Sequence, residues 1–205
     1  MNHSPLMSLA LTGGGWVIWA LILSSIGAVA VAYDRFKLLK EEMAALAALR
    51  APFLAALASR DLNAAGKALK AHPGSAARAL SETLEQAERG PEVCAQHLSA
   101  SLSDERRHLE GRLLLLGTLG NNAPFVGLFG TVLGVIKAFH DLAESGAGPE
   151  VVMAGLSEAL VATAVGLMVA IPCVLGFNFL QKILRDLLSE TEALGRRLAA
   201  ASARR

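Results

Sequence analysis

Three long runs of apolar residues alternate with polar segments along the chain. The central run, residues 113–136, has 24 positions without a charged side chain. A membrane-spanning helix needs only about 20 such residues. The first run carries no charge, and the third carries one acid, Glu158. The pattern predicts an all-α membrane protein with three transmembrane helices, over residues 13–33, 113–140 and 151–181.

Stripes of small residues follow one face of the second and third segments. Their members recur at alternating spacings of three and four, so each stripe shares a helical face. In lipid, small residues let helix backbones approach closely. Because three helices cannot enclose a pore alone, the stripes predict self-association into a closed ring. They comprise Gly117, Gly120, Pro124, Gly127, Thr131, Gly134 and Ala138, then Ala159, Thr163, Gly166, Ala170 and Cys173.

Lysine and arginine predict the orientation, because cytoplasmic loops are enriched in both. They lie next to those ends of the apolar runs that border residues 34–112 and the C-terminal segment. Residues 1–33 carry none, and Lys137 is the one basic residue near the other end of a run. The N-terminus is therefore expected outside and the C-terminus inside. The remaining segments are a short periplasmic N-terminus (1–12), a cytoplasmic helical domain (34–112), a periplasmic loop (141–150) and a cytoplasmic C-terminal helix (182–205).

The long cytoplasmic segment is rich in alanine and is expected to be helical. Proline and glycine predict breaks at residues 51–52, 72–74 and 90–91. Residues 92–111 are expected to lead into the second span without a break, and the C-terminal helix is expected to continue the third span. These helices would form a bundle beneath the membrane.

Composition agrees with a membrane protein and excludes several functions. Hydrophobic residues (AVILMFWYC) make up 53% of the chain and charged residues 18%. The net charge of +1 provides no strong positive electrostatic field that would attract nucleic acid. Cys94 and Cys173 lie far apart, without metal-ligand spacing. No phosphate-binding, hydrolase or metalloprotease motif is present, and residues 13–15 (Gly-Gly-Gly) are expected to be a flexible lead-in. We therefore expect no enzyme activity, cofactor or metal.

Glu158 is the acid inside the third segment. A charge at the bilayer centre costs about 2.5–3.5 kcal/mol, so such residues normally face a cavity or a partner. Either Glu158 lies at a subunit contact or channel mouth, or it lies near the headgroups and pairs with Lys137. Five residues separate it from Thr163, which is about 140° around a helix, so the two side chains point in different directions.

Thr131 and Thr163 lie at the centres of the two stripes, and we expect them to share a lumen. The alternative is that each hydroxyl bonds a carbonyl of its own helix. Pro124 either bends its helix to shape that lumen or is a tolerated membrane proline. The sequence leaves the role of four further polar residues open. They could form hydrogen bonds between helices, face water or lie at the outer membrane interface. These residues are Asn121, Asn122, Lys137 and His140.

Two runs carry a family resemblance. Residues 122–135 read NAPFVGLFGTVLGV and resemble the APFVGLLGTVxG signature of the ExbB/TolQ/MotA proton-channel family. Residues 155–167 read GLSEALVATAVGL, with AIP at 170–172, and resemble its IAEALLATAxGLxxAIP signature. The resemblance covers residues 120–178 closely. It is nearest to ExbB and TolQ, because MotA has four spans.

The resemblance implies a pentamer in the bacterial inner membrane, whose second and third helices line a lumen. An ExbD-like or TolR-like single-span partner in the lumen would supply an Asp carboxylate. Proton flow would then energise a TonB-like protein, or a TolA-like protein in the TolQ alternative. A non-conducting scaffold and a substrate transporter are further alternatives. Thr131 and Thr163 match the family's lumen threonines, and Glu158 matches its span-three glutamate. The expected lumen residues are Pro124, Gly127, Thr131, Gly134, Ala159, Thr163, Gly166 and Ala170.

Overall fold

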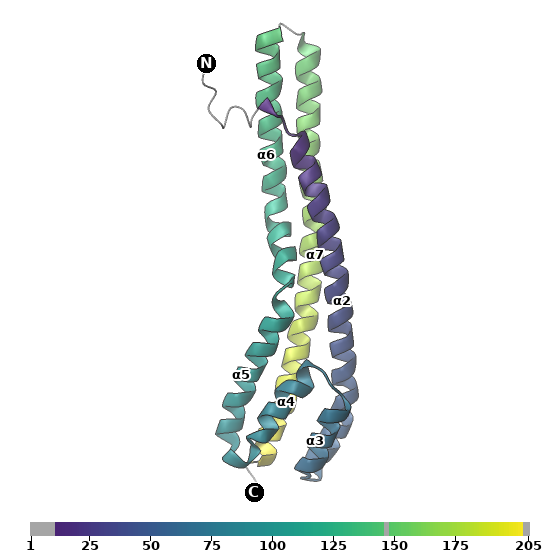
Figure 1. Ribbon diagram of the computed structural model, residues 1–205, viewed down its shortest axis with the longest axis vertical. Coiled ribbons are helices and arrows are strands. Elements are labelled where there is room, and N and C mark those ends of the chain that lie inside the picture. Colours follow the sequence, from purple (N-terminus) through teal and green to yellow (C-terminus); the bar gives the residue numbers. More distant parts are fainter. Residues whose placement is uncertain (1–10, 146–147, 203–205) are drawn as a thin grey trace. The chain divides into compact units, whose positions relative to one another are not determined.

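The computed structural model describes residues 11–145 and 148–202. Every regular element in these residues is a helix, which confirms the predicted all-α class (Figure 1). Because residues 1–10 and 146–147 lie outside this description, the predicted segments 1–12 and 141–150 are described only in part. The elements are α2 (Gly15–Ala58), α3 (Leu62–Ala71), α4 (Ser75–Glu85), the 3-10 helix η1 (Ala87–Arg89), α5 (Pro91–Glu110), α6 (Leu113–Ser145) and α7 (Pro149–Ser202).

Helices α2, α6 and α7 are each long and apolar enough to cross a membrane. They match the three predicted spans, but each continues past the apolar run into polar sequence. α6 reaches Ser145 and α7 begins at Pro149, so little of the predicted loop 141–150 lies outside a helix. Helix hydrogen bonds form within the backbone, and a helix therefore does not have to end where apolar side chains end.

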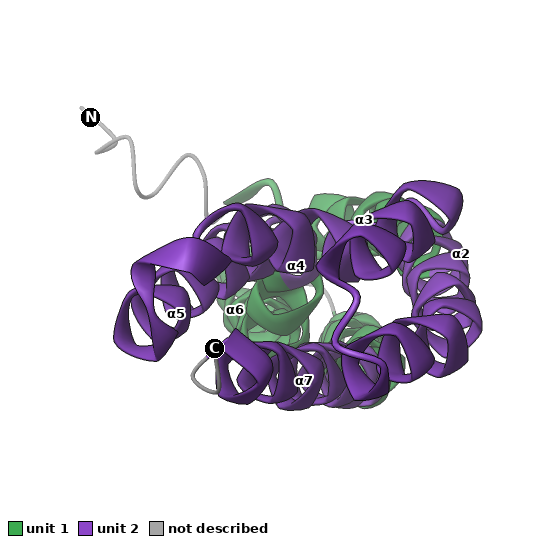
Figure 2. Ribbon diagram, turned by 90° about the horizontal axis from the view of Figure 1, so that it is seen from below, with its two compact units in different colours: residues 1–32, 114–177 green, residues 33–113, 178–205 purple. Residues whose placement is uncertain are grey.

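The chain divides into two compact units, which Figure 2 distinguishes by colour. Unit 1 comprises residues Met1–Ala32 and Leu114–Phe177, and unit 2 comprises Tyr33–Leu113 and Asn178–Arg205. The two units differ in which side chains they bury.

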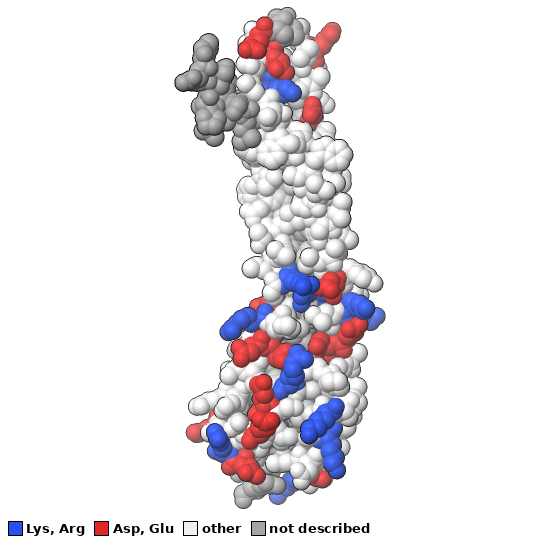
Figure 3. Space-filling model, viewed as in Figure 1, with Lys and Arg blue, Asp and Glu red and all other residues white. Residues whose placement is uncertain are grey.

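Unit 1 buries many small residues and exposes most of its large apolar ones, although Leu21 and Leu116 are buried. Ala123 and Ala162 are fully buried, whereas Phe125 and Met168 are 69% and 72% exposed. Residues 15–32, 114–136 and 159–177 carry no Lys, Arg, Asp or Glu, and they form the uncharged white surface in Figure 3. Large apolar side chains on the outside and small ones inside are what helices in lipid require, because acyl chains do not penalise exposed hydrocarbon.

Unit 2 is built like a water-soluble bundle. Its large fully buried side chains are mostly leucine, and they recur at helical spacing along α2 and the end of α7. Each such side chain contributes about 1.5–3 kcal/mol when it leaves water. Members of this core include Leu39, Leu46, Leu49, Phe53, Leu80, Leu109, Leu184, Leu187 and Leu198.

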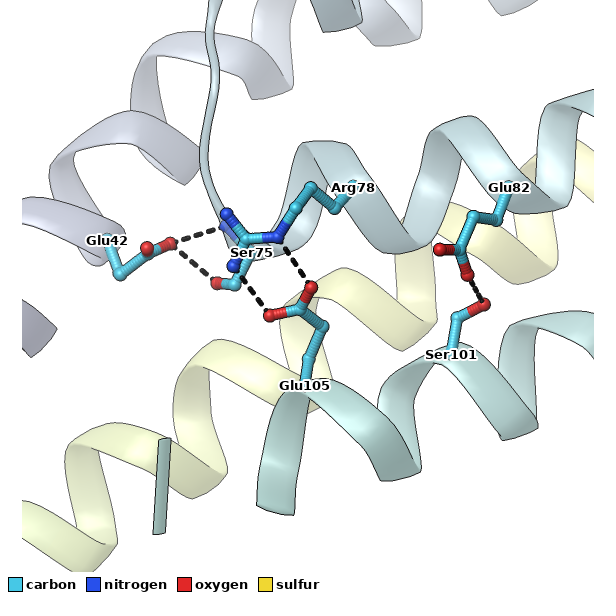
Figure 4. Close-up of polar contacts among 6 residues, drawn as sticks. All are labelled: Glu42, Ser75, Arg78, Glu82, Ser101 and Glu105. Atoms are coloured by element: carbon cyan, nitrogen blue, oxygen red, sulfur yellow. Dashed lines mark hydrogen bonds and ion pairs between the residues drawn. The ribbon is translucent and has the colours of Figure 1, made fainter. Parts of the chain in front are cut away.

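Polar contacts hold α4 against its neighbours in unit 2 (Figure 4). Glu42 Oε2 on α2 accepts bonds from the Ser75 backbone N–H at 2.7 Å and the Ser75 hydroxyl at 2.6 Å. Arg78 donates two bonds of 2.7 Å to the Glu105 carboxylate on α5, and this pairing raises the pKa of the Arg78 guanidinium. The Ser101 hydroxyl also donates to Glu82.

The helix break predicted at residues 51–52 is wrong, because α2 continues through Pro52 to Ala58. Proline removes the bond to the carbonyl of residue 48, but both positions are exposed, so water reaches that carbonyl. The chain instead turns at Arg60, where φ is 58°, and Asp61 caps α3 by accepting from Ala64 N–H at 2.9 Å. The predicted breaks at 72–74 and 90–91 are confirmed.

The predicted continuous helix from residue 92 into the second span is also wrong. α5 ends at Glu110, Gly111 and Arg112 form a turn, and α6 begins at Leu113. Gly111 keeps right-handed helical angles. Arg112 Nη1 contacts Asp34 Oδ2 at 3.3 Å. By contrast, α7 runs without interruption from Pro149 to Ser202, as the sequence predicts for the continuation of the third span.

Candidate functional site

The two small-residue stripes meet each other inside one chain. A Cβ on Gly134 of α6 would lie 2.7 Å from Ala159 Cβ on α7, and a Cβ on Gly120 would lie 3.3 Å from Cys173 Cβ. Later positions on α6 contact earlier positions on α7, as antiparallel helices in register do. We call this contact the α6–α7 seam and define it by Gly120, Gly127, Thr131 and Gly134 on α6 with Ala159, Thr163, Gly166 and Cys173 on α7.

Gly127 and Gly166 form the closest part of the seam. A Cβ on Gly127 would lie 2.7 Å from the Ala162 carbonyl oxygen, and a Cβ on Gly166 would lie 2.7 Å from the Ala123 carbonyl oxygen. The contact is therefore reciprocal, with each glycine facing the carbonyl one turn before the other. Such an approach permits weak Cα–H···O bonds, and any larger residue would push the helices apart.

Self-association of the chain stays a prediction, and the structure shows that each stripe also has a partner within the chain. The stripes are expected to hold copies together, and within the chain each contacts the neighbouring helix. Sequence periodicity identifies a face that packs closely and carries no information on whether the second helix belongs to the same chain or to another copy.

The hydroxyls of Thr131 and Thr163 are bonded across the seam, with their oxygens 2.8 Å apart. The Thr131 oxygen also lies 2.8 Å from the Leu128 carbonyl and 3.2 Å from the Gly127 carbonyl of its own helix. Among the described residues, Thr163 has no bond to its own helix. The bonding of a hydroxyl to its own helix, left open by the sequence, thus applies to Thr131 and not to Thr163.

This threonine pair lies at the edge of the seam away from α2. Gly130 and Ala162 each precede a threonine by one residue, and a Cβ on Gly130 would contact both Ala162 and Val17 of α2. One residue turns a helix by about 100°, so Thr131 and Thr163 point to the opposite edge. Both threonines are half-buried in the single chain.

Glu158 lies apart from the threonine pair, as the helical angle predicted. It is exposed and lines a cavity of about 300 Å³ with Lys137, Asp141 and the glycines at the start of α2. No ion pair joins Glu158 to Lys137 in the described part of the chain, although both face this cavity.

Residues 13–15, which the sequence predicts as a flexible lead-in, pack against α6 in the structure. Gly13 has a positive φ of 76°, and a Cβ on Gly14 would lie 2.4 Å from the Gly130 carbonyl oxygen. The backbone at Gly14 therefore packs directly on α6, which requires glycine at both positions. Sequence reasoning also missed Gly130, Ala123 and Ala162. Their small size was the available signal, but they lie off the two stripes.

The remaining candidates take ordinary positions. Pro124 is half-buried within α6, which continues past it, and Ala170 is buried on α7. Asn122 donates to the Thr118 carbonyl of its own helix at 2.7 Å, while Asn121 is exposed. His140 Nε2 lies 3.4 Å from Glu144 Oε2. No group of His, Cys, Asp and Glu that could hold a metal ion occurs in residues 11–145 and 148–202.

Comparison with known proteins assigns the chain to a family. The model of the MotA/TolQ/ExbB proton channel family matches residues 69–193, more than half of the chain. The chain therefore belongs to the MotA/TolQ/ExbB proton channel family, and with its three membrane-capable helices it is a multi-pass membrane protein.

Individual relatives carry two different names. The chain is 44% identical over 89 residues to the biopolymer transport protein ExbB of Aquifex aeolicus, covering 43% of this chain and 60% of the relative. It is 43% identical over 88 residues to the Tol-Pal system protein TolQ of Pseudomonas aeruginosa, covering 42% and 38%. A putative ExbB-like protein of Helicobacter pylori is 46% identical over 81 residues, covering 37% and 54%. The matches thus span no more than 60% of these relatives.

Proposed function

We propose that this protein is a proton-channel subunit of the inner membrane that couples the proton motive force to mechanical work on a partner. Its α6 and α7 would line a lumen, and an ExbD-like single-span partner would supply the titratable carboxylate. The energised protein would be TonB-like, in outer-membrane transport. This role requires no covalent chemistry in the chain itself.

The observation that carries the proposal is the threonine pair at the α6–α7 seam. Its two hydroxyls lie in a stretch where residues 114–136 and 159–177 carry no charge, so they are polar groups that could bind water or a partner's carboxyl there. A path for protons through the membrane needs such polar stations. Threonine does not titrate usefully, so the carboxylate has to come from another protein.

The proposal includes a ring, with the N-terminus outside and the C-terminus inside. A single three-helix chain cannot enclose a lumen, and the edge of the seam at Thr131 and Thr163 is not covered by α2. Closed cyclic symmetry would turn this edge of every copy toward one axis. The pentamer and the inner-membrane location rest on the family resemblance, and the orientation also rests on the Lys and Arg asymmetry.

A TolQ-like role in energising a TolA-like protein is the second candidate. The ExbB and TolQ relatives are 44% and 43% identical to this chain over segments of similar length, so identity favours neither. The neighbouring genes distinguish the two, because TonB-like and TolA-like reading frames accompany different systems. A non-conducting scaffold is a third candidate.

The test separates a proton-coupled subunit from a scaffold. Thr163→Val keeps the shape of the side chain and removes its hydroxyl. We expect this variant to assemble with the partner but to lose at least tenfold in energised uptake, measured in cells that depend on this protein. Thr118→Val is the matched control, because Thr118 is an exposed threonine on α6 outside the seam. Full uptake by Thr163→Val and by Glu158→Ala would favour the scaffold.

A further inference from the structure

Arg35 on α2 is the one charged residue among the buried polar residues of 11–145 and 148–202, and it is 8% exposed. The Nε atom of Arg35 is enclosed without a hydrogen-bond partner in the described part of the chain. An ion taken out of water needs a counter-ion or hydrogen bonds, so this environment is unusual. The other buried polar residues are hydroxyl-bearing, and each donates a hydrogen bond: Ser75, Thr83, Ser101 and Thr191.

The acids of unit 2 closest to Arg35 are shared with other groups. Asp34 Oδ2 lies 3.6 Å from Arg35 Nε, too far for a hydrogen bond, and 3.3 Å from Arg112 Nη1. Two arginines thus share one exposed carboxylate. We call Asp34, Arg35 and Arg112 the Arg35 cluster, and it retains one net positive charge.

The Arg35 cluster lies where uncharged segments of the sequence end. On α2, residues 15–32 carry no Lys, Arg, Asp or Glu, and Arg35 follows three positions later. Arg112 directly precedes α6, whose residues 114–136 are also uncharged. Tyr33 is 71% exposed, and tyrosine is enriched where membrane and water meet. A membrane around the uncharged segments would therefore bring its phosphate layer to the cluster.

We propose that the Arg35 cluster binds the phosphate group of a phospholipid. A guanidinium is planar and can bond a phosphate through two nitrogens at once, and these charge-assisted bonds are stronger than neutral ones. The single negative charge of a phosphodiester balances the net charge of the cluster. This site is separate from the threonine pair, and its existence does not depend on the proposed function.

The access to the cluster fits a ligand that arrives from the surroundings. Asp34 and Arg112 are exposed, so a headgroup can reach the cluster from outside the chain. Within the Arg35 guanidinium, Nε is the enclosed atom and faces Asp34, which leaves the terminal nitrogens Nη1 and Nη2 as donors to a ligand. Arg112 would supply the second cation, and Arg35 the buried part of the site.

The first experiment measures thermal unfolding of the detergent-exchanged protein with and without added phosphatidylglycerol. Without lipid, Arg35→Leu should raise the midpoint, because it removes a buried charge that the chain does not balance. Phosphatidylglycerol should stabilise the wild type and leave Arg35→Leu unchanged, since a ligand stabilises only the protein that binds it. Lys37→Leu is the matched control, because Lys37 is exposed two residues away and should respond to the lipid as the wild type does.

The second experiment counts bound phosphatidylglycerol by native mass spectrometry. Arg35→Gln, which also serves if the leucine variant does not fold, should weaken lipid binding by at least about tenfold, the usual value of a hydrogen bond to a charged group. Arg35→Lys keeps the charge and loses the planar donors, so its affinity should lie between the two. Lys37→Gln should change the affinity by less than about twofold, as expected for an exposed charge.

Three results would overturn the proposal. Equal losses in Arg35→Gln and Lys37→Gln would show general attraction of the lipid to positive charge. An equal stabilisation by inorganic phosphate alone would show a site for a free anion and not for a lipid. If the lipid leaves the wild type unchanged, while a co-expressed single-span partner stabilises it and not Arg35→Gln, the cluster binds a carboxylate of that partner.

Discussion

Gly127 shows at the scale of one residue how sequence and packing are connected. Glycine in a helix interior costs about 1 kcal/mol relative to alanine. The residue is nevertheless required here, because a Cβ would lie 2.7 Å from a carbonyl oxygen of α7. Gly27 on α2 has the opposite environment, since a Cβ there would meet nothing within 4 Å.

The first prediction compares these two glycines. Gly127→Ala should destabilise the protein by about 1–3 kcal/mol, because α6 and α7 must separate to admit the methyl group. Gly27→Ala, the matched control, should be neutral or stabilising by up to about 1 kcal/mol, because alanine favours the helix. Thermal unfolding in detergent measures both changes. An equal effect at the two positions would contradict the close contact.

Residue spacing predicted which faces pack and which threonines lie on them. It could not predict that Thr131 bonds both its own helix and Thr163, while Thr163 bonds across the seam and, within the described residues, not to its own helix. That asymmetry depends on the distance and rotation between two helices, which no local pattern contains. For the same reason, the backbone contact of Gly14 with Gly130 was missed.

At the scale of the element, α4 depends on a residue outside its own sequence. Its N-cap, Gly74, has no side chain to accept the free backbone N–H groups at the helix start. Glu42 on α2 accepts the Ser75 N–H instead, at 2.7 Å. A Cβ on Gly74 would lie 3.0 Å from the Glu42 carboxylate, so the glycine leaves room for this distant cap.

The second prediction tests this distant cap. Glu42→Ala should cost about 1–2 kcal/mol, the usual effect of losing an N-cap, and should lower hydrogen-exchange protection at the start of α4. Glu41→Ala removes the same charge one residue away, and Glu41 is exposed. We expect this control to change stability by less than about 0.5 kcal/mol. Equal losses would indicate a general charge effect and not a cap.

Some helix ends depend on nearby residues alone, and others depend on how distant segments pack. The breaks at 72–74 and 90–91 were predictable because glycine and proline act locally there. Pro52 was misinterpreted because the cost of an interior proline depends on whether water reaches the freed carbonyl, and that depends on which face of α2 is exposed. The start of α3 was missed although Asp61 is an ordinary capping residue.

At the scale of the whole molecule, large apolar side chains cover the outside of unit 1, and lipid or other copies must face them. Examples are Phe125, Leu160 and Met168, all more than two-thirds exposed. If copies assemble into a ring, these larger side chains are available for the contacts between them. The proposed lumen then depends on the seam edge at Thr131 and Thr163.

The third prediction concerns this assembly. Native mass spectrometry of the detergent-solubilised protein should give a whole multiple of the 21.4 kDa chain, a pentamer by the family resemblance, with additional mass when the partner is co-expressed. Gly127→Ala should lower the unfolding stability of the single chain more than it lowers the association between copies. A protein that remains monomeric with and without a partner would contradict the ring.

The sequence by itself determined the three apolar helices, the family and the faces that must pack closely. Those properties depend on side-chain chemistry and on helical periodicity, both of which are local. The tertiary structure decided that the two small-residue faces meet within one chain and that Glu158 stands apart from the threonines. It also decided that Thr163 has no acceptor on its own helix. These outcomes depend on the register and rotation of one helix against another, which arise only when distant segments pack.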